Sequence, residues 1–357
     1  MYKDFEVKSI FRTYKTFFQS YVTALPDRIK DGDIIIIDSN VARLYPDIQE
    51  LIKSNKVFII EANEEAKSYE HIGKLLNKII AHGFSKTDKL IGIGGGVIQD
   101  ITAFSSSILF RGVEWLFFPT NLLTQCDSCI GSKTSVNCGE YKNQLGGFYP
   151  PSEIFIDFKF WDTISTQEVS SGLGEMLHYF FVDGIDDINK LQSEISQAYD
   201  NKEVLLSLVG RSLSIKRKMI EIDEFDKGPR NVFNYGHSFG HALESVTSYQ
   251  IPHGIAVAIG MDLANIISAH KGLIDISLRN EARNVLCEVW KNTTLPEVSI
   301  DEYFNALSKD KKNEGKTIKV ILTRGFGDMF KGTLEDNTEI RQLITEFFSL
   351  KKYEGDL

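Results

Sequence analysis

Strand-like and helix-like segments alternate through the first half of this chain, and that alternation restricts the folds open to it. Residues 68–82 have helical periodicity that ends at Gly83, and the polar stretch 38–41 is typical of the start of a helix. Short apolar runs typical of buried strands occur at 33–38, 57–60, 90–93 and 115–120. Strands that alternate with helices form a parallel sheet, and such sheets bind ligands at the carboxyl ends of their strands. The pattern predicts an N-terminal α/β domain with a ligand site at one edge of its sheet.

A glycine turn follows the third predicted strand. Residues 91–100 read as a strand, three consecutive glycines (94–96) and a helix that begins at about Gln99. Glycines let the backbone approach a pyrophosphate, and a helix N-terminus supplies N–H donors. The turn departs from the Rossmann fingerprint, which has spaced glycines after the first strand. It favours a different nucleotide-binding α/β fold, although many α/β proteins use such a turn only for packing.

The second half of the chain has a different pattern. From about Trp161 onward amphipathic helices dominate and the strand signal fades. A chain of 357 residues commonly forms two domains. We therefore predict an α/β domain at 1–157 and an all-helical domain at 158–357.

Composition narrows the choice of partners. The net charge is −9, so the protein as a whole does not attract polyanions. We therefore expect it to bind neither nucleic acid nor anionic membranes. A local cluster of lysines and arginines can still bind a small anion. The charged N-terminus lacks a signal-peptide core and no apolar run approaches the roughly 20 residues of a membrane span, so we expect a cytoplasmic protein. The four cysteines, which include the pair Cys126 and Cys129, are expected to be reduced and mostly buried thiols.

Histidines and one glutamate mark a candidate metal site. His237 and His241 are four residues apart and share one helix face, and His253 follows a proline in a predicted loop that leads into a helix. Upstream, Glu175 lies in an apolar helical segment. One glutamate and two histidines form a ligand set that leaves a position open for substrate or water. Each histidine alone is better explained as an ordinary hydrogen-bonded residue, but the cluster with Glu175 favours a metal.

Several of these motifs together resemble 3-dehydroquinate synthase and, more broadly, the sugar phosphate cyclases. The resemblance runs in order from about Asp38 to Leu322. It rests on the triple glycine with Asp100, residues 119–123, 125–128, 131–134, 142–143 and 172–175, the helix that starts at Gly236-His237, and His253-Gly254.

The resemblance implies an N-terminal α/β NAD-binding domain, a helical metal-binding domain, an active site between them and a homodimer. It places one divalent ion, zinc or cobalt, on Glu175, His237 and His253. It places NAD contacts at Asp38, Asn40, Glu64, Lys67, Gly95, Gly96, Val97, Asp100, Thr120, Leu123, Asp127 and Lys142. It places catalytic and substrate-binding residues at Arg111, Lys133, Asn143, His178, Lys216, Arg230, Asn234, His241 and the pair Lys311-Lys312, with Arg111 reaching the phosphate site of the neighbouring subunit.

The implied activity is that of a carbon–oxygen lyase acting on an anionic sugar phosphate. NAD takes a hydride, phosphate leaves from beside the new ketone, NADH returns the hydride, and an intramolecular aldol step closes a carbocycle. Three alternatives remain: a cyclase for another sugar phosphate in cyclitol or surface-polysaccharide synthesis, a metal-dependent polyol dehydrogenase, and a non-enzymatic binding protein.

Several residues differ from the family pattern at positions that bear on the choice of substrate. His178 stands where dehydroquinate synthases carry lysine three residues after the metal-binding glutamate, so it either replaces a substrate-facing cation, adds a ligand to the metal or merely packs on its helix. Ile255 replaces a family glutamate, and further departures occur at Gln99, Asn121 and Ser132. Lys216 and Arg230, which meet a carboxylate in dehydroquinate synthase, are retained and favour an acidic substrate.

Overall fold

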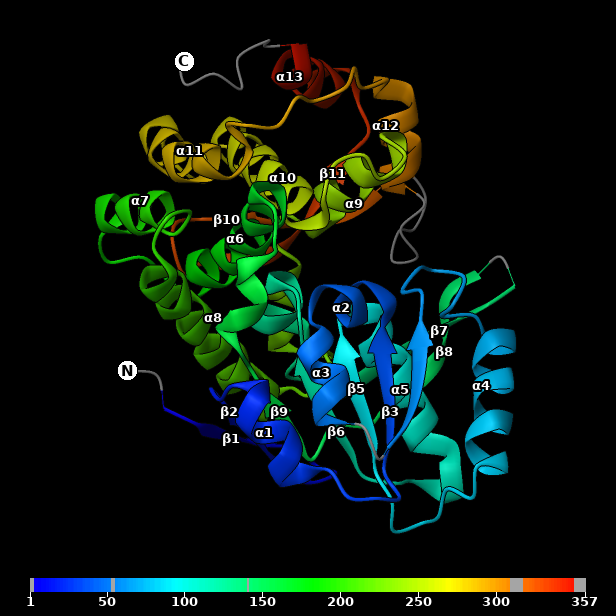
Figure 1. Cartoon of the computed structure of the whole chain (residues 1–357). Coiled ribbons are helices and arrows are strands. Elements are labelled where there is room, and N and C mark those ends of the chain that lie inside the picture. The colour runs from blue at the N-terminus through cyan, green and yellow to red at the C-terminus, as the bar shows by residue number, and fades with distance from the viewer. Residues whose placement is uncertain (1–2, 53–54, 140, 309–316, 350–357) are drawn as a thin grey trace. The chain divides into compact units, whose positions relative to one another are not determined.

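The computed structural model describes residues 3–52, 55–139, 141–308 and 317–349 (Figure 1). The chain forms two compact units. The first comprises Met1–Ile164 with Arg217–Glu224, and the second comprises Ser165–Lys216 with Phe225–Leu357.

The first unit is built on a seven-stranded sheet. The strand order is β1 (Phe5–Lys8), β2 (Thr13–Phe17), β9 (Glu153–Phe155), β6 (Trp115–Pro119), β5 (Leu90–Gly94), β3 (Ile34–Asp38) and β4 (Lys56–Ile60). β1 is antiparallel to β2, and the other neighbouring pairs are parallel. The four strands expected from the apolar runs are confirmed as β3, β4, β5 and β6, whereas β1, β2 and β9 were not predicted.

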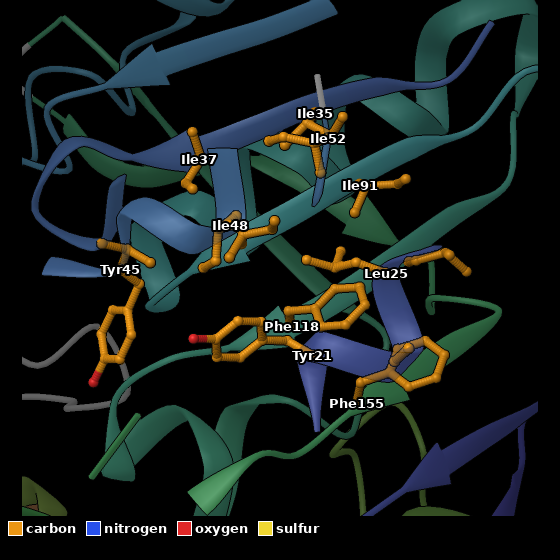
Figure 2. Packing of buried hydrophobic residues seen from close by; sticks show 14 of the residues in the cluster. Tyr21, Leu25, Ile35, Ile37, Tyr45, Ile48, Ile52, Ile91, Phe118 and Phe155 are labelled. Carbon is orange, nitrogen blue, oxygen red and sulfur yellow. The ribbon is translucent and has the colours of Figure 1, made fainter. Parts of the chain in front are cut away.

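Helices cover both faces of this sheet. Figure 2 shows part of the core that the central strands form with α1 (Tyr21–Arg28), α2 (Ser39–Leu44) and α3 (Pro46–Leu51). Ile35, Ile37, Tyr21, Ile48 and Phe118 all belong to this buried cluster. α5 (Gly96–Ile108) packs on the strands as well, and Gly92 of β5 is needed there because a Cβ on it would lie 2.8 Å from Thr102 Oγ1. A strand buried on both faces carries an uninterrupted apolar run, which explains the sequence Ile34–Ile37.

Two further details of the first unit differ from the expectation. α5 begins at Gly96 rather than at about Gln99, because Gly95 already serves as its N-cap. β7 (Lys133–Cys138) and β8 (Tyr141–Phe148) form a two-stranded antiparallel sheet, which was not predicted. The remaining helix, α4 (Tyr69–Ala81), matches the predicted one.

The second unit is largely helical. Its helices are α6 (Thr166–Asp183), α7 (Ile188–Gln197), α8 (Lys202–Ile222, whose end from Arg217 belongs to the first unit), α9 (His237–Val246), α10 (His253–His270), α11 (Ile276–Trp290), α12 (Ile300–Ser308) and α13 (Thr338–Ser349). It also contains an antiparallel pair, β10 (Thr317–Thr323) with β11 (Met329–Glu335), so the expectation of an all-helical domain missed a hairpin. α10 is buried along most of its length and packs against α6, α9 and α11.

Glycines allow α6, α9 and α10 to approach one another closely. A Cβ on Gly254 of α10 would lie 1.7 Å from the carbonyl oxygen of Ser171 on α6, and a Cβ on Gly260 would lie 2.1 Å from the carbonyl oxygen of Gly236. Gly236 also has φ +80°, which favours glycine on its own account. These contacts fix the spacing of the three helices at the level of their backbones.

A buried ion pair joins α10 to α11. Asp262 is fully buried and contacts Arg279, whose Nε lies 2.9 Å from Oδ1, and it also pairs with Arg283. Burial raises the pKa of Asp262, and the two guanidinium groups partly offset that effect.

Asp262→Ala is expected to lower the free energy of unfolding by about 3 kcal/mol, because it leaves two largely buried guanidinium groups without their carboxylate. Urea denaturation of both proteins would measure the change. The matched control is Asp328→Ala, whose partner Arg324 is half exposed and 3.7 Å away, and which should cost less than about 1 kcal/mol. Equal losses in the two variants would contradict a special role for the buried pair.

The part of the chain that the structure describes contains no helix with both the length and the hydropathy of a membrane span. The four cysteines are free thiols. Cys126 and Cys129 are buried as expected, whereas Cys287 is partly exposed and Cys138 is exposed, so the expectation of mostly buried thiols holds for only two of them.

Candidate functional site

Glu175 is presented by a well-defined helix in the second unit. α6 begins with a capping box, in which Ser165 and Glu168 each bond to the other's backbone N–H, and it ends at Gly184 with φ +107°. Glu175 lies midway along α6 and is 3% exposed. A carboxylate buried to that degree needs a compensating charge or hydrogen bonds.

The structure brings the three predicted metal ligands together. The Glu175 carboxylate lies with Oε1 3.6 Å from His237 Nε2 and Oε2 3.4 Å from His253 Nε2. One candidate ligand atom from each residue lies within 4.8 Å of the others. Two ligands about 2.1 Å from a tetrahedral zinc ion lie about 3.4 Å apart, so these separations fit a divalent ion. Glu175 Oε2 is buried without a hydrogen bond to any described residue, which also suits a metal ligand.

Both histidine rings are held on the side that faces away from Glu175. His237, the first residue of α9, has Nδ1 3.3 Å from the Tyr235 carbonyl oxygen. His253 has Nδ1 3.2 Å from each carboxylate oxygen of Glu244. His253 lies in the first turn of α10 with Pro252 as N-cap, so the prediction of a loop at this position is wrong by a single residue.

The charges in this cluster are coupled. Burial by itself would raise the pKa of Glu175, but the His178 and His237 rings beside it hold that pKa well below its usual range. Burial by itself favours a neutral His253, whereas the neighbouring carboxylates of Glu175 and Glu244 raise the pKa of His253 to about 10.

His178 belongs to the same cluster. Its side chain is buried, its Nδ1 lies 3.5 Å from Glu175 Oε1, and its ring centroid lies 5.0 Å from that of His237. Phe233 packs against its edge. The residue that replaces the family lysine is thus in contact with a candidate metal ligand and does not lie on the surface of α6.

A cavity of ≈160 Å³ lies in the second unit beside His237. It is lined by the predicted substrate residues Asn234 and His241. Lys319 and Lys331, from the hairpin β10–β11, line it too. Neither lysine was predicted, because the hairpin was not, although the alternation Ile318-Lys319-Val320 is typical of a strand and could have indicated it. Two ammonium groups suit an anionic ligand.

The other predicted substrate residues of the second unit are Lys216 and Arg230. Both side chains are largely buried, Lys216 on α8 and Arg230 in the short 3₁₀ helix Pro229–Asn234. Burial is uncommon for lysine and arginine, most of which are solvated at protein surfaces. Lys311 and Lys312 lie outside the described residues.

In the first unit, predicted NAD residues gather at the carboxyl edge of the sheet. β3 and β5 are neighbours and end at Asp38 and Gly94, and β6 ends beside β5, where Thr120 N–H donates to the Gly94 carbonyl. The chain runs from β3 to β4 on one side and returns to β5 on the other, which creates the switch point where α/β sheets bind ligands. Asp38 also caps α2 by accepting from the Asn40 N–H at 2.8 Å.

The N-terminus of α5 at this edge has no side-chain cap. Gly95 is the N-cap residue and makes no side-chain hydrogen bond, and Gly96 and Val97 form the first turn. The backbone N–H groups of that turn suit the pyrophosphate of a dinucleotide.

Four further predicted residues, Lys67, Asp100, Glu64 and Asn143, take part in polar contacts; Lys67 is buried, whereas Glu64 and Asn143 are exposed. Lys67 Nζ lies 2.8 Å from Asp100 Oδ2, and Asp100 also accepts from the N–H and hydroxyl of Ser135. Burial raises the pKa of Asp100, which Lys67 partly offsets. Asn137, which was not predicted, donates to Glu64 Oε2 and accepts from the Asn143 N–H. Pairing with Asp100 thus occupies Lys67, which was predicted as an NAD contact.

The remaining predictions in the first unit fall on separate elements. Leu123 and Asp127 are partly exposed around the π-helical turn Thr124–Ser128. Lys133 and Lys142 are exposed at the starts of β7 and β8. Arg111 has φ +66° in the turn after α5.

Known proteins confirm the resemblance. A family model for the 3-dehydroquinate synthase N-terminal domain matches residues 57–171, and one for the C-terminal domain matches residues 172–313. The 3-dehydroquinate synthase of Alkaliphilus metalliredigens (strain QYMF) is 33% identical over 306 residues, which are 84% of this chain and 85% of that protein. The chain belongs to the 3-dehydroquinate synthase family. The motif set from Asp38 to Leu322 identified that family correctly.

Solved structures confirm the fold of this family. A 2-deoxy-scyllo-inosose synthase complexed with carbaglucose-6-phosphate, NAD+ and Co2+ has a TM-score of 0.87 at 23% identity, over 96% of this chain and all of that one. A 2-epi-5-epi-valiolone synthase from Streptomyces hygroscopicus subsp. jinggangensis 5008, with NAD+ and Zn2+ bound, has a TM-score of 0.80 at 24% identity, over 96% and 98% of the two chains. The dehydroquinate synthase-like fold, with an α/β N-terminal part and a largely helical C-terminal part, is the predicted one.

Proposed function

We propose that this chain is a carbon–oxygen lyase of the 3-dehydroquinate synthase type, which eliminates phosphate from an acidic sugar phosphate and cyclises the product by an intramolecular aldol step. The observation that carries the proposal is the cluster of the buried Glu175 with His237 and His253 in a member of this family. We further propose that residues 1–157 bind NAD and residues 158–357 bind the metal. A cytoplasmic homodimer stays a prediction.

The residues have separable roles in this proposal. Glu175, His237 and His253 would hold one zinc or cobalt ion, which supplies Lewis acidity for a substrate hydroxyl. The backbone N–H groups of Gly96 and Val97, in the first turn of α5, would hold the pyrophosphate of NAD. The nicotinamide of NAD would accept a hydride and return it. The remaining side chains of the set would bind and orient the substrate anions: Lys133, Asn143, Lys216, Arg230, Asn234, His241 and Lys312. Arg111 would serve the neighbouring subunit.

The direct test is turnover of 3-deoxy-arabino-heptulosonate 7-phosphate with Co2+ and a small amount of NAD. We expect many phosphates released for each NAD molecule, without accumulation of NADH. Stoichiometric NADH without phosphate release would favour a polyol dehydrogenase and contradict the proposal.

A second candidate is a cyclase for another sugar phosphate. The observation in its favour is His178, a buried imidazole where the family carries lysine. An imidazole is mostly neutral near pH 7 in water, whereas lysine offers a permanent cation. The two candidates separate when glucose 6-phosphate is assayed beside the heptulosonate phosphate: turnover of glucose 6-phosphate alone would favour the second.

Arg230→Ala is expected to weaken binding of a carboxylated substrate by about 10- to 150-fold, because a charge-assisted hydrogen bond is worth about 1.5–3 kcal/mol. An analogue that lacks the carboxylate should lose far less affinity. Kd values for both compounds would be compared in wild type and variant. Arg324→Ala, which removes a half-exposed arginine from the hairpin turn, is the control. Equal losses for the two compounds would remove the basis for an acidic substrate.

A further inference from the structure

Glu244 contacts a candidate metal ligand but belongs to no predicted site. It lies on α9, its side chain is only 12% exposed, and both of its carboxylate oxygens are 3.2 Å from His253 Nδ1. The two residues meet because α9 and α10 pack closely through Gly236 and Gly260. Glu244 thus contacts only the Nδ1 side of the His253 ring. The other ring nitrogen, Nε2, faces Glu175 at 3.4 Å.

We propose that Glu244 is a positioning residue for the metal site, which fixes the orientation and tautomer of His253 so that Nε2 presents its lone pair towards Glu175. A neutral imidazole has one N–H and one lone pair, and a carboxylate accepts the N–H. A proton kept on Nδ1 leaves Nε2 as the ligand atom, and the carboxylate also makes the ring a better donor. The assignment rests on the proposed function, because it presupposes an ion held by Glu175, His237 and His253.

The other histidine of the cluster, His237, is restrained in the same way as His253. His237 has Nδ1 3.3 Å from the Tyr235 carbonyl oxygen and Nε2 facing Glu175. Both rings are therefore restrained through Nδ1 and open through Nε2, one by a backbone carbonyl and the other by a carboxylate. Only the restraint on His253 can be removed by changing a single side chain.

An alternative role for Glu244 is to bind a second metal ion. His241, Glu244 and His253 also place three candidate ligand atoms within 4.8 Å of one another. That ion would need His253 to bind metals through both nitrogens, which requires loss of both ring protons. The orientation role needs only the neutral ring and the contact already present, so the geometry favours it.

The test is Co2+ titration of the metal-free protein, followed by binding affinity and by the visible spectrum of the bound ion. Glu244→Gln, which keeps the shape of the side chain and removes its charge, should weaken Co2+ binding about 10- to 100-fold and shift the spectrum. Glu244→Asp should recover part of the affinity. The matched control is Glu339→Gln, which removes a carboxylate 2.9 Å from His270 at the far end of α10 and should change neither readout.

The outcomes separate this assignment from the proposed function. Wild-type affinity and spectrum in folded Glu244→Gln would overturn the positioning role while leaving the metal site in place. Two Co2+ per wild-type chain and one per Glu244→Gln chain would also overturn it, in favour of a second ion. A wild type that binds no Co2+ would overturn the proposed metal site and this assignment with it.

Discussion

His253→Ala is expected to abolish tight binding of the divalent ion and to lower turnover by at least about 10³-fold. The variant removes Nε2 from the cluster in which Glu175 and His237 are the other candidate ligands. Lewis-acid assistance contributes several kcal/mol to a reaction of this type, and each 1.36 kcal/mol is a factor of ten in rate. Metal content after dialysis and phosphate release would be measured on the same preparation.

The control for this variant lies on the same helix. His270 is the last residue of α10 and pairs with Glu339 at 2.9 Å, away from the cluster. His270→Ala should keep both the metal content and the activity of the wild type. Full metal occupancy in His253→Ala would remove the ligand assignment, whatever the effect on activity.

Gly254→Ala is expected to cost more than about 5 kcal/mol in the free energy of unfolding, or to prevent folding of the second unit. The new methyl group would lie 1.7 Å from the Ser171 carbonyl oxygen and 3.1 Å from the Glu175 backbone nitrogen, so α6 and α10 would have to separate. Losses of this size are exceptional for a single substitution and occur where backbone packing leaves no space. Thermal and urea denaturation of the purified variant would measure the change.

A helical glycine with open space around it provides the comparison. Gly73 lies in α4, and a Cβ there would meet nothing within 4 Å. Gly73→Ala should stabilise the protein by about 0.5–1 kcal/mol, because alanine loses less backbone entropy in a helix. A Gly254→Ala protein as stable as the wild type would show that α6 and α10 can adjust, and would contradict the argument from close packing.

The central part of the fold was predictable because its signal is strong. Strands that are buried on both faces consist of consecutive apolar residues, so β3, β5 and β6 could be located from these apolar runs. β1 and β2 are four- and five-residue strands near one edge of the sheet with alternating exposed side chains, and so they lack such a run. The hairpin β10–β11 had a clear alternation but was overlooked among helices.

The three residues of the candidate metal cluster could be predicted from the sequence, whereas the polar contacts around them could not. Glu175, His237 and His253 are recognisable because their residue types and motif order are specific. Glu244 and Asn137 could not be recognised in this way, because Glu244 meets His253, and Asn137 meets Glu64, only where separate elements pack together. Lys67 and Asp100 were each predicted as NAD contacts, but the ion pair between them was not predicted.

The close approach of α6, α9 and α10 has a consequence for the protein without its ion. Contacts between glycines and backbone atoms set the distance between these helices, so the donor atoms are assembled before any ion binds. A zinc finger, by contrast, unfolds when its metal is withdrawn. Here a chelator should yield an inactive apoprotein that stays folded and can be reloaded, and the ion would add to stability only through its own binding equilibrium.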